Sequence, residues 1–306
     1  MDTVHSPGHV TGPLATRTPA SHSTWLAMAL FALGLVLVVV ALAGPGAFGF
    51  VSYRTSESGR AQIVGADIVG MSIVAPLSFL AGFRVLRGHL GATRLAIAPA
   101  LFAAYDLAQL ALGEEYFRYS GDVAVFFPFL VGGFTLAMVV AAGCCRIDSP
   151  PAAPGRVWSR GRDRMVGGIL LALVAAIALG MHLPAYLDAL SQRPHNLGYL
   201  ETPTAFWVVK FLDLGIVIPA IAAIGFGLLR RRAWARRAAA PAMAFCALLA
   251  SAVLAMAVAM VADHAPDGST VGVAVWAVIA ALLGWAAVDV QRVHAPKRTA
   301  VLAGSR

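Results

Sequence analysis

Four charged residues lie inside long runs of apolar side chains, and their chemistry is the first guide to what this chain does. They are Asp67, Asp106, Lys210 and Asp213. One such charge in hydrocarbon costs at least about 2.5–3.5 kcal/mol on insertion scales, so an ionisable residue in this setting usually has a purpose. Lys210 and Asp213 are three residues apart, which places them on one face of a helix. A carboxyl held there without a cation can take up a proton, bind a metal ion or bind a substrate amine.

These residues are expected at a common depth. At about 1.5 Å of rise per residue, all four charged side chains fall in the outer half of a bilayer, roughly 9–13 Å from its outer surface. Three uncharged polar side chains are expected near the same level: Gln62, Tyr105 and Gln109. Tyr105 and Gln109 are four residues apart and share a helix face. We therefore predict an outward-facing ion- or solute-binding site built from these seven residues.

Two alternative roles for the charged residues stay open. Asp67 and Lys210 are 143 residues apart, which is the offset of an internal repeat described below, so they are expected to form an ion pair that clamps the helices together. Buried polar contacts often do no more than this, each contributing about 0.6 kcal/mol on average in membrane proteins. The charged side chains could also face lipid or extend to the surface.

The apolar runs that carry these residues are long enough to cross a bilayer, which takes about 20 apolar residues. Proline and polar residues interrupt the third run, which makes it the weakest of the set. The predicted spans are 24–43, 61–83, 94–113, 122–144, 165–186, 204–229, 239–262 and 269–290.

The composition also indicates a membrane protein. The chain is 59% hydrophobic and 12% charged, whereas a soluble protein carries about 25% charged residues. Because no alternating strand pattern is visible, we predict an all-α, eight-span membrane protein with the lipid bilayer as its main partner. Nucleic acid is not an expected partner, because the net charge of +8 comes from arginines spread over short loops rather than from a basic face.

The distribution of lysine and arginine predicts the orientation. With both termini in the cytoplasm, eighteen of these residues fall in cytoplasmic segments and four in outer loops. Such a bias is the usual sign of the cytoplasmic side. We expect a bacterial cytoplasmic (inner) membrane protein with both ends inside.

An internal repeat is suggested by two segments, APLSFLAGFRVLRG (75–88) and IPAIAAIGFGLLRR (218–231), which align at an offset of 143. The alignment matches Pro76 with Pro219 and the Gly-Phe pair at 82 with that at 225. We predict two parallel four-helix halves, 24–145 and 165–290, related by an axis along the membrane normal as in some transporters. A basic linker (146–164) joins them, and the ends are a disordered tail (1–23) and a basic tail (291–306). Coincidence among similar apolar helices is the alternative.

The stretches GADIVGMSIVAPLSFLAG (65–82) and FLDLGIVIP (211–219) resemble a group of polytopic membrane proteins of high-GC bacteria. The resemblance covers most of the eight-span region and implies the same span count. Because that group has no assigned activity, the resemblance assigns no residue a role.

Histidine and cysteine give little sign of a metal or cofactor. His182, His195 and His264 are expected at the outer surface beside several carboxylates, but they come from different loops and lack the spacing of a zinc motif. Cys144, Cys145 and Cys246 show no metal-binding spacing either. We therefore predict no metal and no cofactor.

Three classes of function remain. The first is an ion- or proton-coupled transporter of a small solute, which requires a cavity between the halves that reaches Asp213. The second is an accessory or assembly protein without chemistry. The third, which fits least, is a membrane enzyme acting on a lipid-like substrate, which requires His182 or His264 beside a carboxylate in a cleft. The sequence assigns neither a substrate nor an oligomeric state.

Overall fold

The structure is a computed structural model that describes residues 20–89, 91–146 and 159–294. The predicted disordered tail, basic linker and basic tail lie outside these residues, apart from their inner ends, which continue the neighbouring helices. In the described part every regular element is helical. Their bounds are α1 (Ala20–Ala43), α2 (Glu57–Val69), η1 (Gly70–Val74), α3 (Ala75–Leu86), α4 (Ala92–Leu112), α5 (Val123–Arg146), α6 (Arg160–Ala175), η2 (Ala176–His182), α7 (Leu183–Ala189), α8 (Leu197–Glu201), α9 (Pro203–Leu212), η3 (Asp213–Val217), α10 (Ile218–Leu229), α11 (Ala233–Ala262) and α12 (Thr270–His294).

The eight predicted spans are confirmed. Eight continuous helical stretches in the described residues are long and apolar enough to cross a membrane, and each overlaps one predicted run. Three of them combine several elements: α2–η1–α3, α6–η2–α7 and α9–η3–α10. The chain is therefore a multi-pass, all-α membrane protein.

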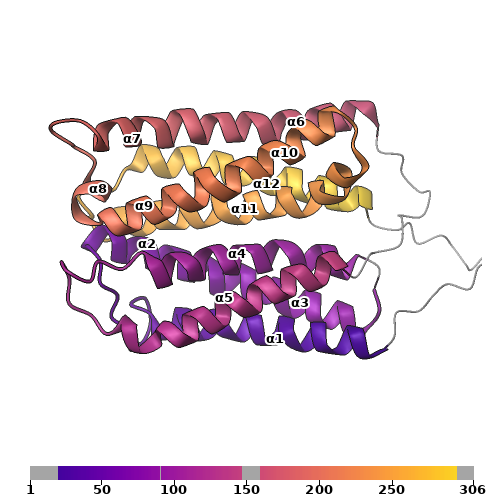
Figure 1. Cartoon of the computed structure of the whole chain (residues 1–306), viewed down its shortest axis with the longest axis horizontal. Coiled ribbons are helices and arrows are strands. Elements are labelled where there is room, and N and C mark those ends of the chain that lie inside the picture. Colours follow the sequence, from indigo (N-terminus) through magenta and orange to yellow (C-terminus); the bar gives the residue numbers. More distant parts are fainter. Residues whose placement is uncertain (1–19, 90, 147–158, 295–306) are drawn as a thin grey trace, which may run out of the picture.

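The helices form two groups that lie side by side along one axis (Figure 1). The first group contains α1–α5 and the second contains α6–α12. Between them α2 packs on α11, while α4 packs on both α11 and α9. The crossing of α2 and α11 is close: a Cβ added at Gly65 would lie 2.4 Å from the backbone nitrogen of Met256.

Three spans change from α to π hydrogen bonding over a short segment, and a proline follows each segment two residues later. η1 precedes Pro76, η2 precedes Pro184 and η3 precedes Pro219. Proline removes one N–H from the helix and crowds the carbonyl of the preceding turn, so the regular α pattern is hardest to keep there. Short π segments inside α-helices are rare and often occur at functional sites.

The π segments of the second and sixth spans share one register. η1 begins at residue 70 and η3 at residue 213, and the helices that follow them, α3 and α10, begin and end at the same offset of 143. The turns after those helices contain Gly88 and Arg231, again 143 residues apart, and both have a positive φ, of 64° and 56°.

The two groups differ in how well their interiors are filled. In the first group, α1 inserts Leu26, Leu30, Leu33 and Leu37, each at most 2% exposed, and packs on both α3 and α5. In the second group α6 packs mainly on α10, and α12 packs mainly on α11. Among the described residues α6 and α12 have no contact comparable to that between α1 and α5. A cavity lies in this less filled region.

Candidate functional site

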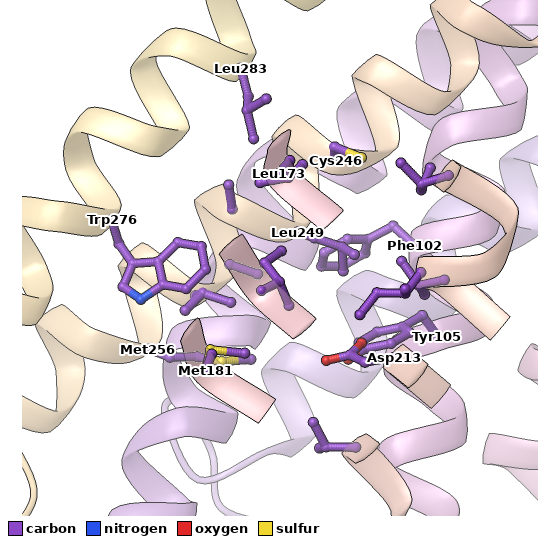
Figure 2. Close-up of a pocket in the computed structure, with 18 of the residues that line it drawn as sticks. Phe102, Tyr105, Leu173, Met181, Asp213, Cys246, Leu249, Met256, Trp276 and Leu283 are labelled. Carbon is purple, nitrogen blue, oxygen red and sulfur yellow. The ribbon is translucent and has the colours of Figure 1, made fainter. Parts of the chain in front are cut away.

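The cavity has a volume of about 220 Å³ and lies where the two groups meet. Its walls are mainly aliphatic and come from α4, α6, η2, α9, η3, α10, α11 and α12, with one glutamine from α2. Figure 2 shows Tyr105 and Asp213 together at one side of it and Trp276 at the opposite side. Five of the seven predicted site residues line it: Gln62, Tyr105, Asp106, Gln109 and Asp213.

Asp213 is the polar centre of this region, because it joins side chains from three spans. The hydroxyl of Tyr105 on α4 donates to Asp213 Oδ1 at 2.8 Å. His182 Nε2 lies 2.9 Å from Asp213 Oδ2. Asp213 opens η3 and His182 closes η2, so both members of this pair depend on the irregular turns of their helices. The contact to Tyr105 also ties the second group to the first.

The expected position of His182 at the outer surface is wrong. Its side chain is 2% exposed and lies within the fifth span, which continues to Ala189. Ala189 comes seven residues after His182, which places His182 roughly 10 Å inside the helix end. A signal for this was present in the sequence, since His182 falls inside an apolar run and not in the polar stretch that follows.

The second ring nitrogen of His182 has an unusual setting. Nδ1 is buried and has no hydrogen-bond partner among the described residues. An unpaired N–H is costly in the interior, so we place the proton on Nε2, from which it is donated to Asp213. This neutral tautomer leaves only a lone pair on Nδ1.

The expected ion pair between Asp67 and Lys210 is also wrong. Both side chains are buried, but neither forms an ion pair in the described structure. Lys210 Nζ lies 3.6 Å from the ring centroid of Phe206, one turn earlier on the same helix. Asp67 Oδ2 has no hydrogen-bond partner and faces Gly44, at which an added Cβ would lie 2.6 Å from that oxygen. Asp67 therefore points to the end of α1 in its own group.

Asp106 has a different setting from the other carboxylates. It lines the cavity, is 7% exposed, and makes no side-chain hydrogen bond within the described residues. Its charge is felt by Asp67, so the two carboxyls lie within electrostatic reach of each other. Asp106 is the buried acid of this site that still lacks a partner.

Polar contacts join the two groups at the end of the bundle where α4 ends and α9 begins. Glu115 accepts hydrogen bonds from the backbone N–H and the hydroxyl of Thr204, at the start of α9. Arg118 donates to the carbonyl of Leu200. Ser58 Oγ on α2 donates to Asp267 at 2.5 Å. These contacts hold the two groups together at this end.

At the opposite end of the bundle, where α6 and α11 begin, the ion pairs lie within the second group. Arg236 donates to Asp163 from Nε at 2.9 Å and from a terminal nitrogen at 2.5 Å, and Asp163 is 1% exposed. Arg162 pairs with Asp289 at 3.0 Å. These contacts join α6 to α11 and α12.

In the part of the chain that the structure describes, the other histidines belong to no metal-binding cluster. His195 Nδ1 lies 3.4 Å from Asp188 on an exposed loop. In residues 20–89, 91–146 and 159–294, no three His, Cys, Asp or Glu side chains are grouped so that they could hold a metal ion.

No protein-family model, no curated protein and no solved structure matches this chain.

Proposed function

We propose that the protein moves a small solute across a bacterial cytoplasmic membrane together with a proton, with both termini in the cytoplasm. The observation that carries this proposal is the cavity that reaches Asp213, whose carboxylate is held by Tyr105 from one group and by His182 from the other. A site at the boundary between two helix groups is where a relative movement of the groups changes access.

A proton on Asp213 would alter its contacts with Tyr105 and His182. The ionised carboxylate accepts from both side chains. A protonated carboxyl carries a hydrogen on one oxygen, so the donor at that oxygen would face another donor. The tyrosine hydroxyl at Oδ1 can rotate and accept instead, but the Nε2–H of His182 at Oδ2 is fixed in the ring plane. A proton on Oδ2 would therefore weaken the link between the fifth and sixth spans.

The packing of the second and sixth spans supports a two-fold repeat, which we propose as the basis of the movement. The outer parts of these spans, α2 and α9, pack across the boundary, on α11 and α4. Their inner parts, α3 and α10, pack within their own groups, on α1 and α6. The π segments η1 and η3 lie between these parts in the same register. Each span can therefore bend where its two packing partners change.

An enzymatic role is less well supported. His182 satisfies the expectation of a histidine beside a carboxylate, but its Nδ1 is buried and contacts no nucleophile in the described residues. A catalytic histidine needs its second nitrogen within hydrogen-bond reach of the reacting group. An accessory role without chemistry does not account for buried carboxyls on a cavity wall.

The test is flux in proteoliposomes that contain a pH-sensitive dye. A panel of small amines, alcohols and carboxylates is added under an imposed pH gradient. We expect at least one of them to drive proton movement in the wild type, and Asp213→Asn to abolish it while the protein remains folded. Asp263→Asn is the matched control, because Asp263 is an exposed carboxylate after α11 that does not line the cavity.

Two results would overturn the proposal. One is flux that continues unchanged in Asp213→Asn. The other is a wild-type protein that moves no member of the panel and no protons, although it is correctly inserted.

A further inference from the structure

The chemistry of the cavity wall restricts the ligand. The ionisable oxygen groups of the lining are Tyr105, Asp106 and Asp213, which carry no positive charge, and no lysine, arginine or histidine lines the cavity in the described residues. Most of the remaining wall is aliphatic. Binding sites are commonly apolar with a few polar groups that fix orientation. The wall therefore suits a ligand that is apolar over most of its surface and positive at one end.

Asp106 is the group that requires the positive end. Asp213 already contacts Tyr105 and His182, whereas Asp106 is buried without any partner in the described structure. The nearby lysine, Lys210, is directed at the ring of Phe206 and does not line the cavity. A buried carboxylate is tolerated when a cation pairs with it and satisfies its oxygens. An ammonium group on the ligand supplies the positive charge and the hydrogen-bond donors for the carboxylate oxygens.

The size and shape of the cavity set the rest of the ligand. Tyr105 and Asp213 lie at one side and Trp276 at the opposite side, with aliphatic side chains between them (Figure 2). The volume of about 220 Å³ is below the roughly 300–1,000 Å³ of sites for drug-sized molecules. A short apolar body that ends in a single amine fills this space.

The route to the cavity leads through the bilayer. The wall includes Ile177 from η2 in the fifth span and Trp276 from α12, the eighth span. Within the described residues these two spans have no packing contact comparable to that between α1 and α5. Leu179 and Leu282 on the same two spans are 64% and 62% exposed, as expected for side chains that face lipid. Where α4 ends and α9 begins, the contacts of Glu115 and Arg118 join the two groups.

We propose that the cavity binds a small lipophilic amine, which enters from the membrane between α6 and α12, places its ammonium group at Asp106 and extends its apolar body towards Trp276. Binding of the amine does not depend on the proposed function. Only the consequence of binding rests on that function, under which the amine is the solute that is moved.

The test compares three molecules of the same shape. Binding of 2-phenylethylamine, 2-phenylethanol and 3-phenylpropionate to the full-length protein in phosphatidylcholine nanodiscs is measured by calorimetry. We expect the amine to bind at least tenfold more tightly than the other two, and Asp106→Asn to weaken its binding at least tenfold. Asp263→Asn is the control, because Asp263 is an exposed carboxylate after α11 that does not line the cavity, and it is expected to leave the affinity unchanged. Equal affinity for all three, no binding of any, or an unaffected Asp106→Asn would overturn the proposal.

A second variant covers the case in which Asp106→Asn does not fold. Val253→Phe fills the cavity from α11 without replacing a carboxyl, and we expect it to abolish amine binding. Unchanged amine affinity in a folded Val253→Phe protein would place the binding elsewhere and overturn the proposal.

The lateral route is tested with brominated lipids, which quench tryptophan fluorescence on contact. A variant that keeps only Trp276 is expected to be quenched, and 2-phenylethylamine is expected to relieve the quenching. A variant that keeps only Trp285, which is 66% exposed, is expected to be quenched with or without the amine. Trp276 fluorescence that is equal in brominated and ordinary lipid would overturn the route.

These outcomes separate the two proposals. Amine binding without flux supports the ligand class and removes the transport function. Proton-coupled flux of an alcohol or a carboxylate supports the transport function and removes the ligand class.

Discussion

Asp67, Asp106 and Asp213 are three aspartates within membrane-spanning helices, yet their surroundings differ. Asp213 contacts Tyr105 and His182, Asp106 faces the cavity without a partner, and Asp67 packs against the end of α1. What distinguishes a structural carboxyl from a ligand-binding one is therefore the set of atoms around it.

Glu114, in the loop between α4 and α5, permits a prediction about pH. Burial raises the pKa of its carboxyl from 4.5 to about 7, although the backbone N–H of Arg54, at 2.6 Å, acts in the opposite direction. A carboxyl whose pKa is raised by folding contributes full stability below its unfolded pKa, and this contribution is lost as the pH rises through the folded pKa. We expect the Tm of the purified protein to fall between pH 4.5 and 7 by more in the wild type than in Glu114→Gln.

Glu57→Gln is the matched control for this experiment, because Glu57 is an exposed residue of the first turn of α2. Its Tm profile is expected to follow that of the wild type. Parallel profiles for the wild type and Glu114→Gln would show that Glu114 does not titrate in this range.

Among the elements, α2 and α11 form the closest described contact between the groups. Glycine at this crossing lets the two backbones approach, as small residues do between membrane helices. A methyl group at Gly65 would meet the backbone of Met256 at 2.4 Å, and backbone atoms cannot move aside as a flexible side chain can.

We expect Gly65→Ala to lower the free energy of unfolding by about 1–3 kcal/mol, the usual cost of overpacking. Gly132→Ala is the matched control, since an added Cβ there meets nothing within 4 Å, and alanine favours a helix over glycine by about 0.5–1 kcal/mol. Chemical denaturation in detergent measures the free energy of unfolding of both variants. Equal stability of the two variants would mean that the α2–α11 contact is looser than described.

For the whole molecule, the position of the polar contacts indicates which parts can separate. Those at the end where α4 ends and α9 begins, such as Glu115 with Thr204 and Ser58 with Asp267, join the two groups. The ion pairs at the opposite end join helices of the second group only. A movement of one group against the other would break the first set and leave the second intact.

The orientation of the molecule is a prediction that reporter fusions can test. We expect a fluorescent protein at the C-terminus to fold and fluoresce in the cytoplasm. Alkaline phosphatase inserted after Arg193, between α7 and α8, is expected to be active, and the same enzyme inserted after Arg232, between α10 and α11, to be inactive. The reverse pattern would contradict the assignment based on arginine.

The sequence by itself determined the eight spans, because the length and hydrophobicity of a run are local properties that the bilayer thickness converts directly into a membrane helix. It also picked out Asp213, Asp106, Tyr105, Gln62 and Gln109, because polar residues in hydrocarbon are conspicuous. It did not place His182, whose position depended on how far the fifth span extends.

Only the tertiary structure decided which polar residues meet. The offset of 143 paired Asp67 with Lys210, yet Asp67 turns to Gly44 and Lys210 to Phe206. The first residues of η1 and η3 are also 143 residues apart, and here each proline acts on its own helix. Contacts between helices depend instead on the rotation of each helix and on the size of the residues that face it, and neither can be read from the apolar pattern of a single span.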